Sequence, residues 1–179
     1  MIVTCIIGLE HEGKVYVGGD SATGNGWGLR VATTPKVFRL GELLVGFTDT
    51  WRFGQLLQYS LVVPQRDGED SDERYLIATL IPAIRSTMKD HGYVTTEDSR
   101  ESAGGAIIGY RGRVYELSPN FGLTTFADKV AAVGVGWMFA EGAMLALEQL
   151  APKERILKAL EIVGRCSDGV LPPFTVMEL

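Results

Sequence analysis

The order of strand-like and helix-like segments constrains the fold more than any other feature of this sequence. Four short apolar runs open the chain as two pairs, and a glycine-containing turn typical of a β-hairpin separates the members of each pair. The expected strands are 3–10, 14–19, 36–40, 43–47, 105–110, 113–117, 129–135 and 174–179, and the expected helices are 49–63, about 71–90, 137–150 and 152–163. Blocks of strands alternating with blocks of helices predict an α+β domain, in which antiparallel sheets pack against outer helical layers.

Proline, glycine and acidic residues indicate where the first two helices begin and end. Pro64 should stop the first helix. Asp70 and Glu73 form a possible capping box at the start of the second helix, and Gly92 stands where a glycine commonly ends one. Pro82 lies inside the second helix, so we expect a kink or an opened turn there.

Composition and charge exclude several classes of protein. The chain has 179 residues, of which 46% are hydrophobic and 22% charged, and this suits a single domain spanning 1–179. A net charge of −5 argues against nucleic acid as a partner. No apolar run is long enough for a membrane helix and no signal peptide is evident, so we expect no membrane association and a cytoplasmic location.

Cysteine and histidine give no sign of a metal site. Cys5 and Cys166 could form at most one disulfide, and no Cys/His cluster has the spacing of metal ligands. His11 and His91 lie far apart in polar, turn-like contexts, where surface positions are expected. We therefore predict neither a metal nor another cofactor.

Three residues with complementary chemistry occur at regular intervals near the start of the chain. Asp20 lies 16 residues after Thr4, and Lys36 lies 16 residues after Asp20. In adjacent antiparallel strands these positions can meet at one end of a sheet. A threonine hydroxyl becomes a nucleophile when a base and a cation are near it. A free α-amine on Thr4 would be the base, because such amines titrate near ~7.7–8.0; Lys36 would supply the charge and Asp20 would orient it.

Each of these residues also has a structural explanation when taken alone. Thr4 could be a β-branched strand residue, Asp20 a turn residue bonded to its own backbone, and Lys36 a solvated lysine on an edge strand. Cys5 is a rival nucleophile, but strand alternation places it on the opposite face from Thr4, which favours a buried structural role. The glycine-rich loop GNGWG, residues 24–28, lacks the spacing and βαβ context of a dinucleotide-binding motif.

Several segments are similar to one known family. They are TCIIGLEHEGKVYVGGDSATG (4–24), PKVFRL (35–40), VGFT (45–48), VAAVGVGWMFAEGAMLAL (130–147) and ERILKALEIVGRC (154–166). Together they resemble the proteasome β-subunits and the bacterial HslV peptidase over nearly the whole chain. The resemblance implies the N-terminal nucleophile hydrolase fold, a four-layer αββα sandwich with two antiparallel sheets between helical layers.

The resemblance also implies an activity, a threonine-type peptidase that exposes its own nucleophile and assembles into a homo-oligomeric ring. Thr4, Asp20 and Lys36 match the family's catalytic threonine, aspartate and lysine. The turn at 48–50 matches its oxyanion turn, in which the backbone N–H of Asp49 would be the donor. The implied substrate is a polypeptide, an ATP-dependent unfoldase is a candidate partner, and no cofactor is required.

The chain departs from the family pattern at four places. Val3 precedes Thr4 where the family usually has glycine, and residues 1–3 would have to be removed. Asp49 and Val135 replace a glycine of the oxyanion turn and a helper serine, and RCSDG at 165–169 does not match the late Asp-x-x-Ser motif. Two alternatives therefore stay open: a catalytically degenerate relative with a role in assembly, and an amidase that acts on small substrates.

Overall fold

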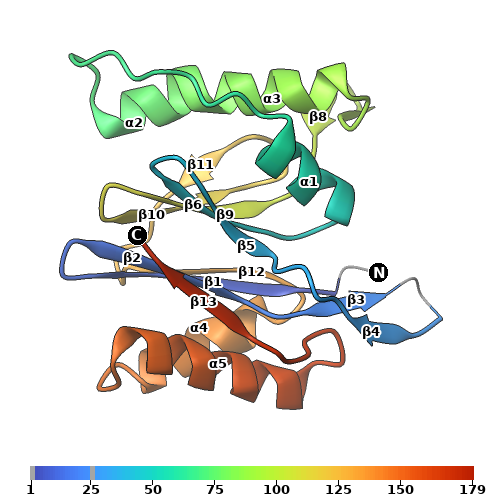
Figure 1. Cartoon of the computed structure of the whole chain (residues 1–179), viewed down its shortest axis with the longest axis vertical. Coiled ribbons are helices and arrows are strands. Elements are labelled where there is room, and N and C mark those ends of the chain that lie inside the picture. Colours follow the sequence, from blue (N-terminus) through green and yellow to red (C-terminus); the bar gives the residue numbers. More distant parts are fainter. Residues whose placement is uncertain (1–2, 25–26) are drawn as a thin grey trace.

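The computed structural model describes residues 3–24 and 27–179, and its helices and sheets are stacked in four layers (Figure 1). The helices α1 (Trp51–Tyr59), α2 (Asp72–Tyr75) and α3 (Ile81–Asp90) form one outer layer. The helices α4 (Trp137–Ala146) and α5 (Pro152–Cys166) form the other. Two antiparallel sheets lie between these layers, so the predicted αββα sandwich is confirmed.

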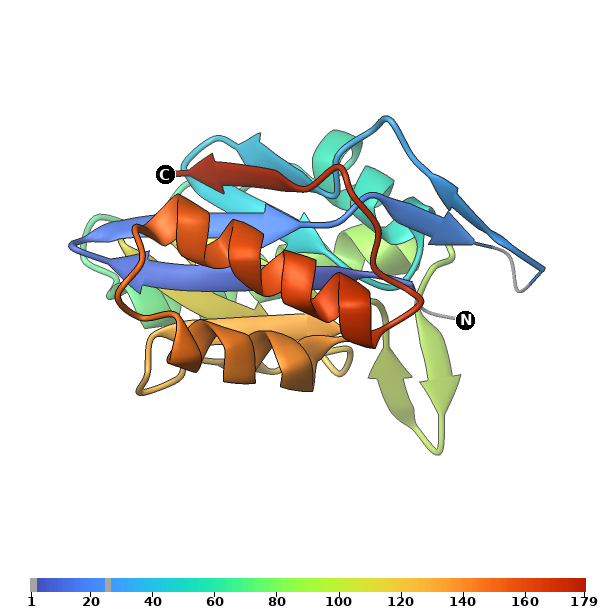
Figure 2. The same cartoon turned by 90° about the horizontal axis from the view of Figure 1, so that it is seen from below.

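The sheets have four and five strands. The first has the order β12-β1-β2-β13, and the second β11-β10-β9-β6-β5. Their strands are β1 (Cys5–His11), β2 (Lys14–Gly19), β5 (Val37–Leu40), β6 (Leu43–Phe47), β9 (Ala106–Tyr110), β10 (Arg113–Leu117), β11 (Leu123–Thr124), β12 (Val130–Gly134) and β13 (Thr175–Glu178). All of the neighbouring pairs run antiparallel. Seen from below, α4 and α5 lie across the first sheet (Figure 2).

Strand alternation explains why β1 can lie between two layers. Cys5, Ile7 and Leu9 pack in the cluster that α4 and α5 cover, whereas Ile6 packs in the cluster between the sheets. Gly46 permits close contact of the two sheets at this point, because a Cβ there would lie only 2.5 Å from Ile6 Cγ2. Thr4 precedes this strand and is two residues from Ile6, so continued alternation would place it on the same face as Ile6.

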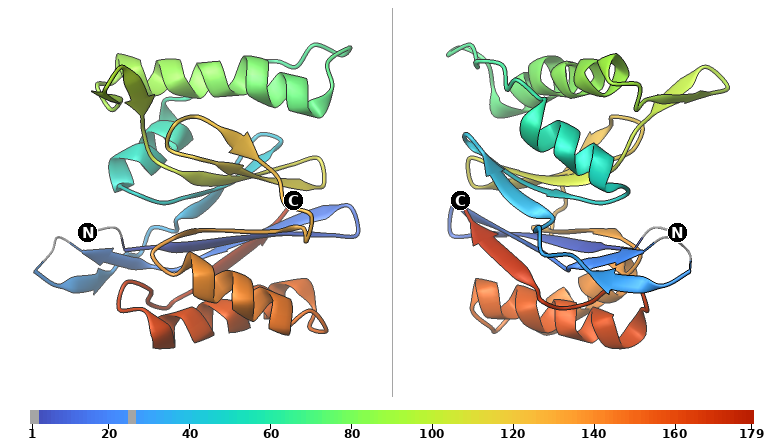
Figure 3. Two further views of the ribbon diagram at one scale, coloured as in Figure 1. Left: turned by 180° about the vertical axis from the view of Figure 1, so that it is seen from behind. Right: turned by 45° about the vertical axis from the view of Figure 1, so that its right-hand side comes forward.

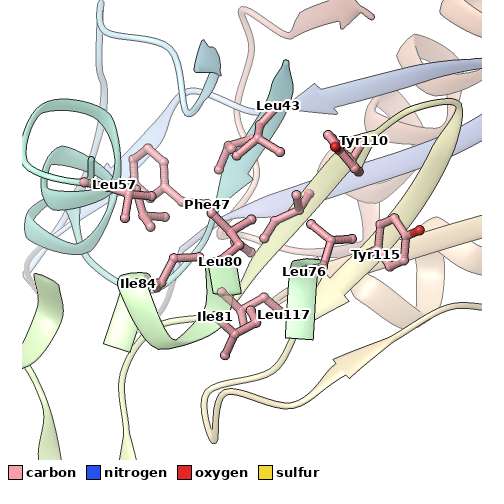
Figure 4. Close-up of a cluster of buried hydrophobic side chains, with 14 of the residues drawn as sticks. Leu43, Phe47, Leu57, Leu76, Leu80, Ile81, Ile84, Tyr110, Tyr115 and Leu117 are labelled. Atoms are coloured by element: carbon pink, nitrogen blue, oxygen red, sulfur yellow. The ribbon is translucent and has the colours of Figure 1, made fainter. Parts of the chain in front are cut away.

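Three apolar clusters fill the three interfaces between the layers. One joins the second sheet to α1, the helical segment 72–90 and the residues between them, and Figure 4 shows part of it, with Phe47, Leu57 and Leu80 among the labelled side chains. A second joins the first sheet to α4 and α5, and a third lies between the sheets. Burial of these faces at ~25 cal/mol per Å² is the main stabilising contribution to the fold.

The helical boundaries differ from the predictions at several places; α4 ends at Ala146 and not at residue 150, and α5 continues to Cys166, beyond residue 163. The first helix ends at Tyr59, not at residue 63, and the chain runs from there to Pro64 without helical structure. The predicted Asp70 cap is wrong, because Ser71 accepts the Arg74 N–H at 3.2 Å. Asp70 instead forms an ion pair with the Arg74 side chain.

The predicted kink at Pro82 takes the form of a π-helical turn, η1 (Leu76–Leu80), between α2 and α3. Proline has no N–H to continue the helical hydrogen-bond series. The wider π-helical turn therefore lies just before Pro82, where the α-helical bonding is interrupted. Gly92 follows the end of α3 with φ +65°, as expected for a helix-ending glycine.

Two hairpins project from the sandwich where no strands were predicted (Figure 3). β3 (Ala22–Gly24) pairs with β4 (Leu29–Val31) on either side of the predicted glycine-rich loop, and residues 25 and 26 of that loop lie outside the described residues. β7 (Thr95–Glu97) pairs with β8 (Arg100–Ser102). Three-residue strands that are largely exposed carry no clear alternation of apolar and polar residues, so their sequence pattern does not indicate them.

Candidate active site

The fold brings Thr4, Asp20 and Lys36 together at one edge of the sandwich. Thr4 immediately precedes β1, Asp20 immediately follows β2, and Lys36 immediately precedes β5. β1 and β2 are neighbours in the first sheet, but β5 is the edge strand of the second. The expectation that all three residues meet at the end of one sheet is therefore wrong for Lys36, which joins the other two from the opposite sheet.

Lys36 is the centre of the hydrogen-bond network. Its ammonium donates to Thr4 Oγ1 at 2.9 Å, to Asp20 Oδ1 at 2.9 Å and to the Val3 carbonyl oxygen at 3.0 Å. The Thr4 hydroxyl donates in turn to the Val3 carbonyl oxygen. Thr4 and Lys36 are 3% exposed and Asp20 is 1% exposed, so the network is almost sealed from water. The three donors of a lysine ammonium are thus all used.

Asp20 is held by backbone N–H groups as well as by Lys36. Its Oδ1 accepts from the Cys5 N–H at 3.0 Å, and its Oδ2 accepts from the Ala22 N–H at 2.7 Å. The Ala22 contact is the local turn bond that the structural explanation of Asp20 requires, and it coexists with the ion pair. Burial lowers the pKa of Lys36 below its ordinary value of 10.5, while the charge and hydrogen bond of Asp20 oppose that shift.

Cys5 lies beside this network but has the properties of a structural residue. It is fully buried among the apolar residues that face α4 and α5. Burial, together with the nearby Asp20 charge, raises the pKa of the Cys5 thiol to about 12, so no thiolate forms at neutral pH. Both cysteines are free thiols, and Cys166 is exposed.

The described residues contain no cluster of three or more His, Cys, Asp or Glu that could hold a metal ion. His11 and His91 are both exposed. Within the same residues, no helix has the length and apolar character needed to cross a bilayer.

Asp49 occupies a left-handed turn next to the threonine. Its φ of +81° favours glycine, and glycine is the residue that the family pattern has at this position. Its Oδ2 accepts a 2.6 Å hydrogen bond from the Tyr93 hydroxyl, which also lies 2.7 Å from Thr50 Oγ1. Thr50 in turn caps α1, because its hydroxyl accepts the Phe53 N–H. The turn is therefore fixed by side chains on both sides.

Tyr93 is the site residue that sequence reasoning missed. It follows α3, 44 residues beyond Asp49, and its ring stacks on Phe53 with the centroids 5.8 Å apart. Burial, reinforced by the hydrogen bond to Asp49, raises its pKa to about 12, which keeps the phenol protonated as a donor. No local pattern connects Tyr93 with Asp49, because only the packing of α1 against α3 brings them together.

A cavity of about 290 Å³ adjoins the network, and Thr4, Lys36 and Asp49 are among the residues that line it. Trp51 and Thr23 form another part of its lining, and the Trp51 indole donates to Thr23 Oγ1 at 3.0 Å. Asp20 does not line this cavity; it lies behind Lys36, to which it is hydrogen-bonded. A small substrate group could therefore approach the threonine hydroxyl between the β3 strand and the start of α1.

The Gly134–Val135 segment positions the threonine backbone. The Val135 N–H donates to the Thr4 carbonyl at 2.8 Å. Gly134 has φ +100°, and a Cβ on it would lie 2.1 Å from the Thr4 carbonyl oxygen, so glycine is required there. Gly169 also packs against Val135. A Cβ on Gly169 would lie only 2.8 Å from Val135 Cγ1. Val135 thus contributes its backbone to the site, and its side chain has no proton to relay.

The segment that the predicted cleavage would remove lies partly outside the described residues. Met1 and Ile2 are not among them, whereas the Val3–Thr4 peptide is. Val3 is 7% exposed, and its carbonyl oxygen accepts from both the Lys36 ammonium and the Thr4 hydroxyl. The carbonyl of the Val3–Thr4 peptide is therefore polarised by a buried cation.

Solved structures share this arrangement of elements over almost the whole chain. BPH from Thiobacillus denitrificans has a TM-score of 0.83 at 18% identity, covering 98% of this chain and 97% of its own, and its complex with epoxomicin has a TM-score of 0.80 at 19% identity with the same coverage. HslV from Trypanosoma brucei has a TM-score of 0.69 at 17% identity, covering 98% of both chains.

Anbu, the ancestral β-subunit from Yersinia bercovieri, has a TM-score of 0.67 at 12% identity, covering 97% of this chain and 80% of its own. The chain has the proteasome-like N-terminal nucleophile hydrolase fold. No protein-family model matches the sequence. The N-terminal nucleophile hydrolase fold is thus retained at sequence identities of 12–19%.

Proposed function

We propose that the protein is a threonine-type peptidase that cleaves its own Val3–Thr4 bond and then hydrolyses polypeptides. The observation that carries the proposal is the contact of the buried Lys36 ammonium with Thr4 Oγ1, Asp20 and the Val3 carbonyl oxygen. Neither an ordinary strand threonine nor a solvated lysine requires such a network. The N-terminal nucleophile hydrolase fold and the complex of BPH with epoxomicin support it further.

Self-cleavage would begin with the hydroxyl that already touches the scissile peptide. Thr4 Oγ1 attacks the Val3 carbonyl carbon, the C–N bond breaks, and the acyl group passes to the oxygen as an ester. Water then hydrolyses the ester, which leaves a Val3 carboxyl group and a free Thr4 amine. The lowered pKa of Lys36 makes its neutral amine accessible, and in that form Lys36 takes the hydroxyl proton and passes it to the Thr4 nitrogen as the C–N bond breaks.

Substrate hydrolysis would use the newly exposed amine as the base. The amine takes the hydroxyl proton, the oxygen attacks the substrate carbonyl, and the leaving amine receives that proton as the peptide bond breaks. Water hydrolyses the acyl ester that remains on Thr4. The Lys36 charge stabilises the developing alkoxide, Asp20 holds Lys36 in place, and the Asp49 N–H is the proposed donor to the oxyanion.

Assembly into a homo-oligomeric ring is part of the same proposal, with an ATP-dependent unfoldase as a candidate partner and the cytoplasm as the location. Large apolar side chains on α4 remain exposed in the single chain, among them Met138 at 63% and Leu145 at 52%. Exposed apolar area of this kind is typical of an interface. Light scattering should therefore report a mass several times 19.5 kDa. A monomer at micromolar concentration would contradict the ring.

One specific observation favours a second candidate, a non-catalytic assembly protein. The Asp49 side chain is held by Tyr93 at the turn where an oxyanion would form, and a carboxylate there opposes negative charge. If this charge cancels the contribution of the Asp49 N–H, the effect equals the loss of one oxyanion donor, about 3–4 kcal/mol of barrier stabilisation. A relic of the site could keep the Thr4–Lys36–Asp20 network for stability alone.

Intact-mass analysis and active-site labelling distinguish the two candidates. If the enzyme proposal holds, the mature chain begins at Thr4, and the Thr4→Ala variant keeps residues 1–3. The mature chain also forms a covalent adduct with a peptide epoxyketone, which reacts with an N-terminal threonine. A wild-type chain that keeps residues 1–3 and takes no label would instead support the assembly protein.

A further inference from the structure

A second and larger cavity, of about 910 Å³, meets the first at Asp49. Its lining is mainly apolar and comes from the ends of strands of both sheets and the start of α4. The large apolar side chains in it are Leu117, Phe126, Val133, Val135 and Trp137. We call this cavity the groove. Its volume is within the range of ligand sites and exceeds the size of one amino-acid side chain.

The groove lies next to the proposed nucleophile, although Thr4 itself lines only the smaller cavity. Gly134 and Val135 line it, and the Val135 N–H is bonded to the Thr4 carbonyl. Asp49, at the proposed oxyanion turn, lines both the groove and the cavity beside Thr4. An extended chain bound across Thr4 would therefore have one side chain in the smaller cavity and continue into the groove.

The charged side chains that line the groove are all acidic. They are Asp49, Glu116 and Glu141, and its lining includes no Lys, Arg or His among the described residues. Burial raises the pKa of Glu116, against a hydrogen bond from Ser118. Burial also raises the pKa of Glu141, as do the neighbouring charges of Asp128 and Glu116. These shifts indicate carboxylates for which the folded chain supplies no sufficient positive charge.

We propose that the groove binds a segment of the substrate polypeptide that carries a lysine or arginine between apolar residues, so that the enzyme selects basic substrates. The apolar walls suit the methylene stem of such a side chain, and the carboxylates suit its cationic head. The inference rests on the proposed function, since it identifies the substrate class of that site. Charge complementarity, and the meeting of the groove with the Thr4 cavity at Asp49, favour a substrate chain over another occupant.

The test measures binding of two fluorescein-labelled peptides by fluorescence anisotropy. They are identical leucine-rich peptides except that one has a central arginine and the other has citrulline, its neutral isostere. The Thr4→Ala chain is used without residues 1–3, so that no peptide is cleaved and Val3 does not compete for the cavity beside residue 4. We expect the arginine peptide to bind about tenfold more tightly, which is the effect of about one charge-assisted hydrogen bond. Equal affinities, or no binding because a second copy covers the groove, would overturn the proposal.

Charge-neutralising variants in the same background locate the effect. Glu116→Gln combined with Glu141→Gln should reduce the preference for arginine to less than about twofold. Glu148→Gln removes one negative charge, where the double variant removes two, from an exposed residue outside the groove and should leave the preference unchanged. If Glu148→Gln reduces the preference as much as the double variant does, the effect is general electrostatics and the groove proposal fails.

The pH dependence gives a test that needs no groove variant. Because the pKa values of Glu116 and Glu141 are raised, the preference for arginine should increase between about pH 4.5 and 7 as these carboxylates ionise. The other acids near them are Asp49, in the groove lining, and Asp128, beside Glu141. A preference that is constant over this range would overturn the proposal. Binding in the Thr4→Ala chain is independent of self-cleavage and labelling, so failure of the proposed function is detected separately.

Discussion

Removal of the Asp20 carboxylate should show how strongly the buried ammonium of Lys36 depends on it. In the Asp20→Ala variant, the 3%-exposed Lys36 loses its ion-pair partner at 2.9 Å, and the Cys5 and Ala22 N–H groups lose an acceptor. Breaking a buried ion pair on one side costs about 3–5 kcal/mol. The double variant Asp20→Ala/Lys36→Met has the same orphaned N–H groups but no buried charge, so the difference between the two variants isolates the charge.

Deprotonation sets an upper limit on that difference. A stranded ammonium can release its proton, and each unit between the pH and an ordinary lysine pKa of 10.5 costs about 1.4 kcal/mol. The cost of the stranded charge therefore cannot exceed about 5 kcal/mol at pH 7. If Lys36 is neutral in the folded variant, the cost falls by about 1.4 kcal/mol for each unit that the pH rises, because the unfolded lysine still binds a proton.

Urea denaturation of the three chains at pH 7, 8 and 9 measures these quantities. We expect Asp20→Ala to be less stable than the double variant at pH 7, with a gap that narrows as the pH rises. Lys158→Met is the matched control, because it breaks an ion pair of similar length, 2.8 Å, in which both side chains are about half exposed, and should cost less than about 1 kcal/mol. If Asp20→Ala costs no more than this control, or if the gap does not change with pH, the reasoning about a desolvated ammonium is refuted.

Four further predictions concern the site and its neighbours. In a chain that already exposes Thr4, Lys36→Ala should abolish labelling by a peptide epoxyketone. Lys36→Arg should restore little labelling, because a planar guanidinium does not replace a compact ammonium. Equal labelling of wild type and Lys36→Ala would show that the network is structural. Asp49→Gly should be about 1 kcal/mol more stable than Asp49→Ala in urea, because both lose the Tyr93 contact but only alanine keeps the strain of φ +81°. Iodoacetamide should alkylate the exposed Cys166 and spare the buried Cys5 in the native protein, as mass spectrometry of digests would report. Folding raises the pKa values of the Cys5 thiol and the Tyr93 phenol to about 12, from 9.0 and 10.0 respectively. The stability that these groups contribute is therefore present below about pH 9 and should be lost as the pH rises toward 12. Urea denaturation at alkaline pH would measure this loss.

The layered α+β class could be predicted from the sequence because its determinants are local, whereas the four-layer αββα sandwich is implied by the resemblance to the proteasome β-subunits and HslV. Alternation in β1 separates Cys5, Ile7 and Leu9 from Ile6, and the same period of two holds for the other long strands. The order of elements then leaves few ways to bury both faces of each sheet. The short hairpins escaped prediction because their strands are only three residues long and bury little apolar surface.

The sequence also determined which residues form the candidate site, since residue type and spacing single out Thr4, Asp20 and Lys36 without any structure. Tertiary structure decided how they meet. Lys36 joins the other two from the opposite sheet, Tyr93 fixes the Asp49 turn, and the acidic groove meets the Thr4 cavity at Asp49. These contacts depend on how layers stack and which side chains lose water. Burial and long-range pairing are properties of the packed chain, and no local pattern encodes them.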